Sequence, residues 1–111
     1  MNISSFQRVS YTFTRPAVSG TWTQTFNVPK GNWLFIGNCD LSGTSGSQDA
    51  QFNVPILGSH YWCCDSAGGD ESRESQGIGV ISADTDTTEY FSVWTNVSIS
   101  GAVYINLIRL R

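Results

Sequence analysis

The sequence is poor in charge. Only 14% of its 111 residues are Asp, Glu, Lys or Arg, against about 25% in an average soluble domain. No run of 18 apolar residues occurs, which excludes a transmembrane helix, and the first residues, MNISSF, lack the apolar core of a signal peptide. With a net charge of −3 and no stripe of basic and aromatic residues, the composition is not that of a nucleic-acid-binding protein.

Catalytic motifs are also missing. The chain has no G-x-S-x-G, no H-E-x-x-H and no glycine-rich phosphate loop. Carboxylates that cleave glycosides lie on rigid strands that face one cleft, whereas every acidic residue here falls in a predicted loop or turn, or at the margin of a strand. We therefore expect no enzymatic activity and no cofactor.

The cysteines do not make a disulfide framework, because their number is odd. A bridge from Cys39 to Cys63 or Cys64 would leave one free thiol, which favours folding in a reducing cytoplasm. A zinc site or a nucleophilic pair built on His60 has little support, since a fourth zinc ligand and the usual C-x-x-C spacing are absent. Small buried cysteines are the default interpretation.

The acidic residues form two short clusters that resemble calcium ligands, one around Asp65, Asp70 and Glu71 and one at Asp84 and Asp86. Calcium takes six to eight oxygen ligands, and neither cluster has the spacing of the D-x-D-x-D-G loop. We expect no metal site.

Short β-strands are predicted over most of the chain. Thr21–Val28 alternates with Trp22, Phe26 and Val28 inward, Pro29–Asn32 is a turn, and a long loop is predicted from Ser59 to Gln76. Turn signals recur at short spacing and no helical period is found, so we expect one all-β domain over residues 1–111, an antiparallel two-sheet β-sandwich of the jelly-roll type with about eight strands. The other predicted strands are Tyr11–Thr14, Trp33–Cys39, Ala50–Ile56, Gly77–Ala83, Glu89–Thr95 and Ala102–Arg111.

The last strand is apolar on both of its faces. Successive side chains of a strand point to opposite sides, and one sandwich has only one interior, so the second face needs another cover. A second copy of the chain would supply it. Together with the doubly apolar strand Trp33–Cys39, this predicts an oligomer interface formed by Trp33, Phe35, Tyr104, Ile108 and Leu110.

Charge is segregated along the chain. Residues 1–30 hold three basic residues and no acid, residues 31–108 hold all nine acids, and Arg109 and Arg111 close the sequence. Because chain termini often lie close together, we predict a basic end that docks on a larger particle through Arg8, Arg109 and Arg111, and an acidic end formed by mid-chain loops. The alternative is scattered, solvated charge.

The segment Ser59–Glu74 concentrates the only histidine, two aromatic residues and several charges. Aromatic rings stack on sugars and charged groups bind hydroxyls or charged partners, which makes this segment a predicted recognition surface. The alternative is that Tyr61 and Trp62 begin a buried strand below a solvated acidic tip. The predicted recognition residues are His60, Tyr61, Trp62, Asp65, Asp70, Glu71 and Arg73.

Two motifs resemble a known family. FNVPKGNWLF (Phe26–Phe35) looks like the F-x-V-P-x-x-G-x-Y-x-F start of the C1q/TNF-like jelly roll, and SGAVY (Ser100–Tyr104) is similar to its closing F-S-G-x-L-L strand. Trp33 stands at the aromatic position and Ile99 replaces the phenylalanine before Ser-Gly. The resemblance implies a homotrimer of the kind found in the tips of bacteriophage fibres and in capsid decoration proteins.

Three functions follow as expectations. The first is a virion structural protein of a bacteriophage, made in the host cytoplasm without a signal peptide, whose partners are itself, other virion proteins and a host glycan or protein bound by the outer loops. The second is a lectin-like, carbohydrate-binding sandwich that acts alone, and the third is a secreted C1q/TNF-like ligand domain. A stable trimer favours the first or third, and a sugar bound to a monomer favours the second.

Overall fold

The structure is a computed structural model that describes residues 7–42, 49–65 and 72–110, with the backbone alone described for 59–65 and 72–74. Nearly all of these residues belong to antiparallel strands, which confirms the all-β class. The strands are β1 (Arg8–Val28), β2 (Gly31–Ser42), β3 (Asp49–Val54), β4 (Ser59–Asp65), β5 (Ser72–Ala83) and β6 (Thr87–Arg109), and the 3-10 turn η2 (Pro55–Leu57) follows β3.

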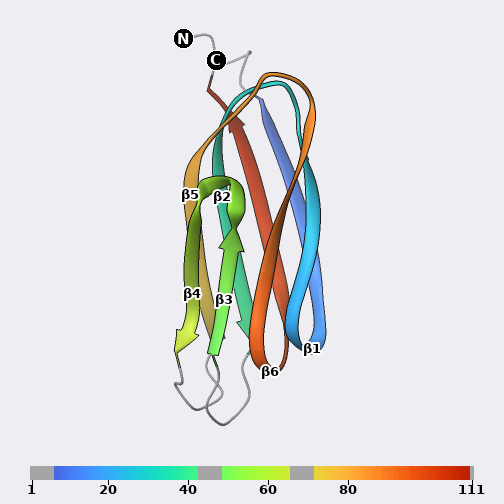
Figure 1. The fold of residues 1–111 in the computed structure, drawn as a ribbon, viewed down its shortest axis with the longest axis vertical. Helices are drawn as coiled ribbons and strands as arrows, with labels where there is room; N and C mark the ends of the chain where they lie inside the picture. Colours follow the sequence, from blue (N-terminus) through green and yellow to red (C-terminus); the bar gives the residue numbers. More distant parts are fainter. Residues whose placement is uncertain (1–6, 43–48, 66–71, 111) are drawn as a thin grey trace.

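Hydrogen bonding joins the six strands into one antiparallel sheet. Its path is β4-β3-β6-β2-β5, and β1 pairs with β6 beside that path. β6 therefore lies at the centre of the fold, as Figure 1 shows.

The strands β1 and β6 are long and fold back together, so that each has two arms (Figure 1). The first arm of β1 (residues 8–15) pairs with residues 101–108 of β6, and the second arm (residues 20–28) pairs with residues 87–95. The register shifts between Arg15 and Gly20, where Gly20 has a φ of 84°. Such irregularities bend a strand without ending its pairing.

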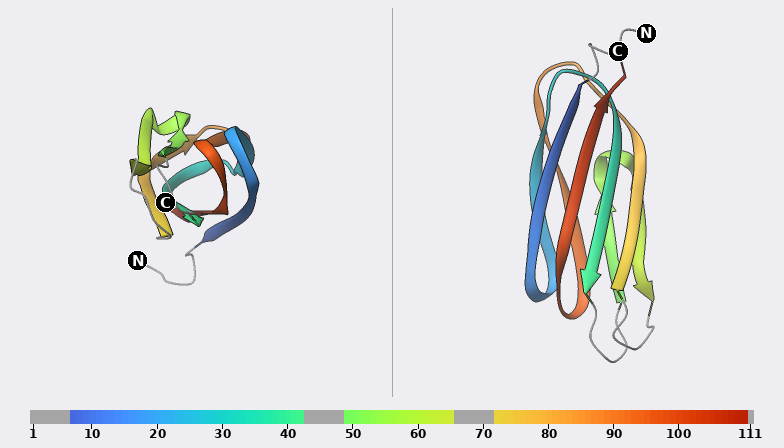
Figure 2. Two further views of the ribbon diagram at one scale, coloured as in Figure 1. Left: turned by 90° about the horizontal axis from the view of Figure 1, so that it is seen from below. Right: turned by 180° about the vertical axis from the view of Figure 1, so that it is seen from behind.

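The two arms of β6 have different neighbours, which makes the sheet enclose one core. Its second arm pairs with β2 from Arg109 to Ser100, whereas its first arm pairs with β3 from Thr95 to Ser92. Viewed along the long axis, the strands surround a common interior (Figure 2).

Phe91 on the first arm of β6 is at the centre of this core and is fully buried. Its ring contacts Phe13, Trp22 and Phe52 at centroid distances of 5.0, 5.8 and 5.9 Å in edge-to-face geometry, the arrangement that aromatic quadrupoles favour. The other buried apolar residues are Phe26, Val28, Trp33, Phe35, Cys39, Leu41, Ala50, Phe52, Val54, Ile81, Val93, Ile99, Val103, Ile105 and Leu107.

The predicted order of strand, turn and strand around Pro29 is confirmed. Phe26 and Val28 are buried and Trp22 is half-buried against the core. β1 ends at Val28 and β2 begins at Gly31, where a φ of 136° favours glycine.

The expected loop from Ser59 to Gln76 is wrong. β4 pairs with β3, with Tyr61 opposite Phe52, and β5 pairs with β2 from Ser72 onward. Both strands lie at the ends of the sheet path, and such edge positions tolerate polar and charged residues that hide a strand in the sequence. At Pro55 the expected strand ends instead in the 3-10 turn, which leaves Ile56 exposed.

The strand count also differs from the expected eight in two sheets. Hydrogen bonds continue through the bends of β1 and β6, so six strands form one bonded sheet.

Candidate functional site

One outer face of the fold is built from four neighbouring segments. The first arm of β1, the second arm of β6, β2 and β5 lie side by side in that order, and their alternate residues point away from the core. On β1 these outward residues are polar and exposed, namely Arg8, Ser10, Thr12 and Thr14.

An apolar patch occupies this outer face toward the end where β1 begins and β6 ends. Leu34 on β2 lies opposite Ile108 on one side and Val80 on the other, and Ile36 lies opposite Ile78. Ile78 is 56% exposed and Val80 is 59% exposed, while the other members are half-buried. These five residues form what we call the outer apolar patch.

The patch arises from an inverted pattern in β5. In GIGVISA (Gly77–Ala83) the glycines point inward and the large residues Ile78 and Val80 point outward. The Leu57 side chain of η2 packs over Gly79, where a Cβ atom would meet two of its carbons within 3.0 Å. With glycine at two of its inner positions, β5 has the large residues Ile78 and Val80 on its outer side, while Ile81 faces the core.

The expected oligomer interface is corrected in part. Trp33 is 1% and Phe35 is 0% exposed, so both side chains lie inside one chain, where a second copy cannot contact them. Tyr104, Ile108 and Leu110 do point outward, and Tyr104 and Leu110 are exposed. The interface predicted from the sequence contains the inner side of β2 and lacks the outer residues Leu34, Ile36, Ile78 and Val80.

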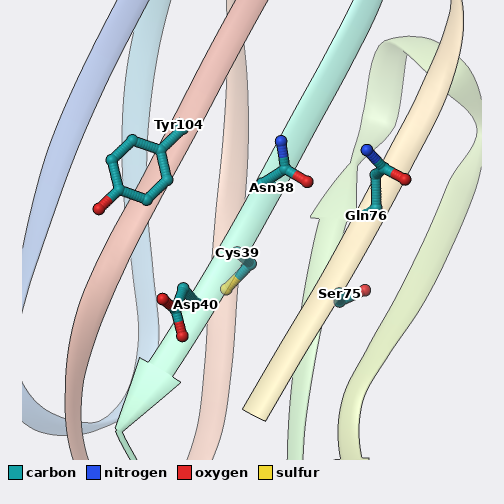
Figure 3. A pocket seen from close by; sticks show the side chains of 6 residues that line it. All are labelled: Asn38, Cys39, Asp40, Ser75, Gln76 and Tyr104. Atoms are coloured by element: carbon teal, nitrogen blue, oxygen red, sulfur yellow. The ribbon is translucent and has the colours of Figure 1, made fainter. Parts of the chain in front are cut away.

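A polar pocket of about 430 Å³ lies on the same outer face, beyond the patch. Asn38 on β2 is directly opposite Tyr104 on β6 and opposite Gln76 on β5, so three polar side chains form a row across three strands, as Figure 3 shows. The residues that line the pocket are Asn38, Cys39, Asp40, Ser75, Gln76 and Tyr104.

The predicted recognition residues are not all described. His60, Tyr61, Trp62 and Asp65 belong to strand β4 and Arg73 belongs to strand β5, with only their backbone described. Asp70 and Glu71 lie outside the described residues. The end of β4 and the start of β5 lie at the end of the molecule opposite the start of β1 (Figure 1).

The basic end is present but mixed. Arg8 and Arg109 lie at the same end, and Arg111 is outside the described residues. The guanidinium of Arg109 lies over the Trp33 ring, 5.5 Å from its centroid. Acidic residues share this end, because Asp86 accepts a hydrogen bond of 2.8 Å from the backbone nitrogen of Lys30.

Arg15, one of the three basic residues of the segment 1–30, is a buried cation. It is 0% exposed and connects the bends of β1 and β6. Its guanidinium donates to the carbonyl oxygens of Val18, Gly20 and Ile99 and, at 3.1 Å, to the Thr95 hydroxyl. Burial lowers the pKa of Arg15 from its ordinary value, and the Cys39 thiol opposes this shift.

Metal ligands do not gather in the described part of the chain. No group of three or more His, Cys, Asp or Glu side chains occurs among these residues. Cys39 is a buried free thiol, and the side chains of His60, Cys63 and Cys64 are outside the description. The described residues include no helix with the length and hydrophobicity that a membrane span requires.

Comparison with solved structures shows a shared fold. No family model and no curated protein matches the chain. The structure of infectious bursal disease virus, Gx strain, is similar with a TM-score of 0.56 and 11% identity over 94% of this chain and 33% of that one. The D431N mutant VP2 protein of infectious bursal disease virus, in derived T=1 particles, has a TM-score of 0.53 and 9% identity over 90% of this chain and 32% of its own.

The VP2 subviral particle of the same virus has a TM-score of 0.50 and 14% identity, over 96% of this chain and 33% of that chain. The chain thus spans about a third of the length of these viral chains. At such low identity the likeness concerns the fold, and the chain shares the antiparallel β architecture of these virus proteins.

Proposed function

We propose that this chain is a structural protein of a virus particle, which assembles with copies of itself through the outer apolar patch. The observation that carries the proposal is the exposure of Ile78 and Val80 on an edge strand. In a folded single chain these residues have nothing apolar to cover them within the described structure.

The fold supports a particle protein of the jelly-roll type. If each arm of β1 and β6 is counted as a strand, eight strands fall into two groups of four, β1–β6–β2–β5 and β1–β6–β3–β4. This grouping supports the proposed jelly roll, an architecture that recurs in viral capsids. The similar VP2 chains are described as subviral and T=1 particles.

The patch has the chemistry of a surface that closes against a copy of itself. Exposed edge strands are normally protected by lysine, proline or a covering segment, yet the stretch of β5 from Ser75 to Ala83 has no charged residue and no proline. Leu34, Ile36 and Ile108 continue the apolar surface from β5 inward over two further strands. A second copy that pairs its own patch would bury all five residues at once, which is the geometry of an isologous interface.

The test is the oligomeric state of a patch variant. In I78T/V80T each substitution keeps a β-branched residue in the strand but removes apolar surface, so the fold is retained and association weakens by at least about tenfold, which corresponds to 1.4 kcal/mol. Sedimentation over a range of protein concentrations measures this change.

The matched control is V18T/Y90T, which changes two exposed apolar residues outside the patch and leaves association unaltered. A wild-type chain that stays monomeric at every concentration contradicts the proposal, and so does equal weakening by both double variants. The number of copies, three by the resemblance, and the bacteriophage setting stay predictions, and the same sedimentation data give the first of them.

A further inference from the structure

The polar pocket lies beside the outer apolar patch and shares none of its five residues. It is lined from three adjacent strands, and its volume of about 430 Å³ lies in the range of about 300 to 1,000 Å³ that small-ligand sites occupy. A single chain supplies the whole lining, so the pocket needs no second copy to be complete.

The polar groups of this pocket have free hydrogen-bonding capacity. The side chains of Asn38, Asp40, Gln76 and Tyr104 form no hydrogen bond with any other described side chain. An amide offers both donors and acceptors, a carboxylate accepts, and a phenol does both. The pocket can therefore hydrogen-bond to several hydroxyl groups at once, because every hydroxyl group needs both a donor and an acceptor as partners.

Tyr104 adds a flat apolar surface to these polar groups. It is 41% exposed, and it lies at one side of the pocket while Asn38 and Gln76 extend the row away from it (Figure 3). Opposite Asp40 the strand β6 carries only the small Ala102, so the sheet surface is hollowed next to the ring. A ring with apolar C–H faces and a polar rim fits between Tyr104 and these groups.

Charge narrows the ligand class. No basic side chain that the structure describes lines the pocket, whereas the carboxylate of Asp40 does. A phosphate, a sulfate or an acidic sugar would meet this carboxylate without a cation to balance it, which costs binding energy. A neutral polyhydroxylated ring has no such cost.

We propose that the polar pocket binds a neutral sugar ring of a glycan, stacked on Tyr104, with its hydroxyl groups hydrogen-bonded by Asn38, Asp40 and Gln76. This goes beyond the assembly proposal and does not depend on it, because the residues of the pocket and of the patch are different. It also moves the expected glycan contact from the segment Ser59–Glu74 to the sheet face.

The experiment is saturation-transfer NMR of the full chain with methyl glycosides of glucose, galactose and mannose, with N-acetylglucosamine, and with N-acetylneuraminic acid as the charged comparison. We expect at least one neutral sugar to bind in the millimolar range. Y104T, which removes the ring, weakens that binding by at least tenfold, and D40N weakens it several-fold.

Y90T is the matched control, because Tyr90 is a similarly exposed tyrosine elsewhere on β6, and it leaves sugar binding unchanged. The proposal is overturned if no neutral sugar binds, if N-acetylneuraminic acid binds better than all of them, or if Y90T loses as much as Y104T. Since I78T/V80T changes assembly without touching the pocket, failure of either proposal is seen separately.

Discussion

At the scale of single residues, Arg15 shows how a charge can serve structure alone. Its guanidinium joins carbonyl oxygens of two different bends, and no carboxylate shares the site among the described residues. Its Nε atom has no hydrogen-bond partner. A buried cation held mainly by backbone oxygens fixes the position of the chain around it, since each oxygen would otherwise be buried without a donor.

Replacing Arg15 by methionine should therefore destabilise the fold strongly. The variant R15M keeps the apolar length of the side chain but leaves several buried acceptors unpaired, and we expect a loss of about 3 kcal/mol or more in the free energy of unfolding. Urea denaturation measures it. R8M, at an exposed arginine, should stay within about 0.5 kcal/mol of wild type, and a similar small effect of R15M would show that the bends do not need it.

The glycines Gly79 and Gly101 differ in what a side chain at their position would meet. A Cβ atom at Gly101 would collide with the backbone oxygen of Asp40, whereas one at Gly79 would meet the flexible end of Leu57. G101A must push β6 from β2, so we expect it to cost about 2 kcal/mol, and G79A to cost clearly less. Thermal unfolding of the two variants compares them, and equal costs would contradict the argument.

Among the strands, those with a clear alternation of apolar and polar residues are the ones whose inner side can be predicted from the sequence. The second arm of β1 could be predicted because Phe26 and Val28 alternate with polar residues, as its inner and outer sides require. In β2 both sides are apolar, so the pattern could not reveal which side faces the core. The sequence pattern predicts Trp33 at an interface, yet its indole nitrogen donates to the Pro29 carbonyl oxygen at 2.7 Å inside the chain.

The candidate site was less predictable than the fold. In β5 the inner positions 77 and 79 are glycines, and the usual rule that large apolar residues face inward therefore places Ile78 and Val80 on the wrong side. The polar pocket brings together residues from β2, β5 and β6 that are far apart in the sequence. These residues lie side by side only because of the strand register, and the register depends on the pairing of the whole sheet.

At the scale of the whole molecule, the fold is a slender body with extents of 49 × 24 × 21 Å, and its two ends differ. Arg8 and Arg109 mark one end, with Asp84 and Asp86 in the turn beside them, while Asp40 and Asp49 lie toward the other. Along the same long axis, the outer face carries the outer apolar patch toward the Arg8 end and the polar pocket toward the other end.

This polarity predicts a docking role for the basic end. For the particle protein proposed above, changing Arg8, Arg109 and Arg111 together to glutamine should reduce incorporation into particles, because three positive charges that would attract an acidic partner surface are lost. Co-purification of the variant with particles measures this. K30Q, at the same end but with its backbone already held by Asp86, is the control, and unchanged incorporation of the triple variant would rule the role out.

The paired arms of β1 and β6 also bear on how the chain is made. Arg8 pairs with Ile108 and Val28 pairs with Thr87, so almost every hydrogen bond of the first strand waits for the last. Pairing between such distant segments slows folding. On the ribosome β1 therefore remains without its partner until β6 has emerged, and the strand edges of β1 stay exposed during that interval.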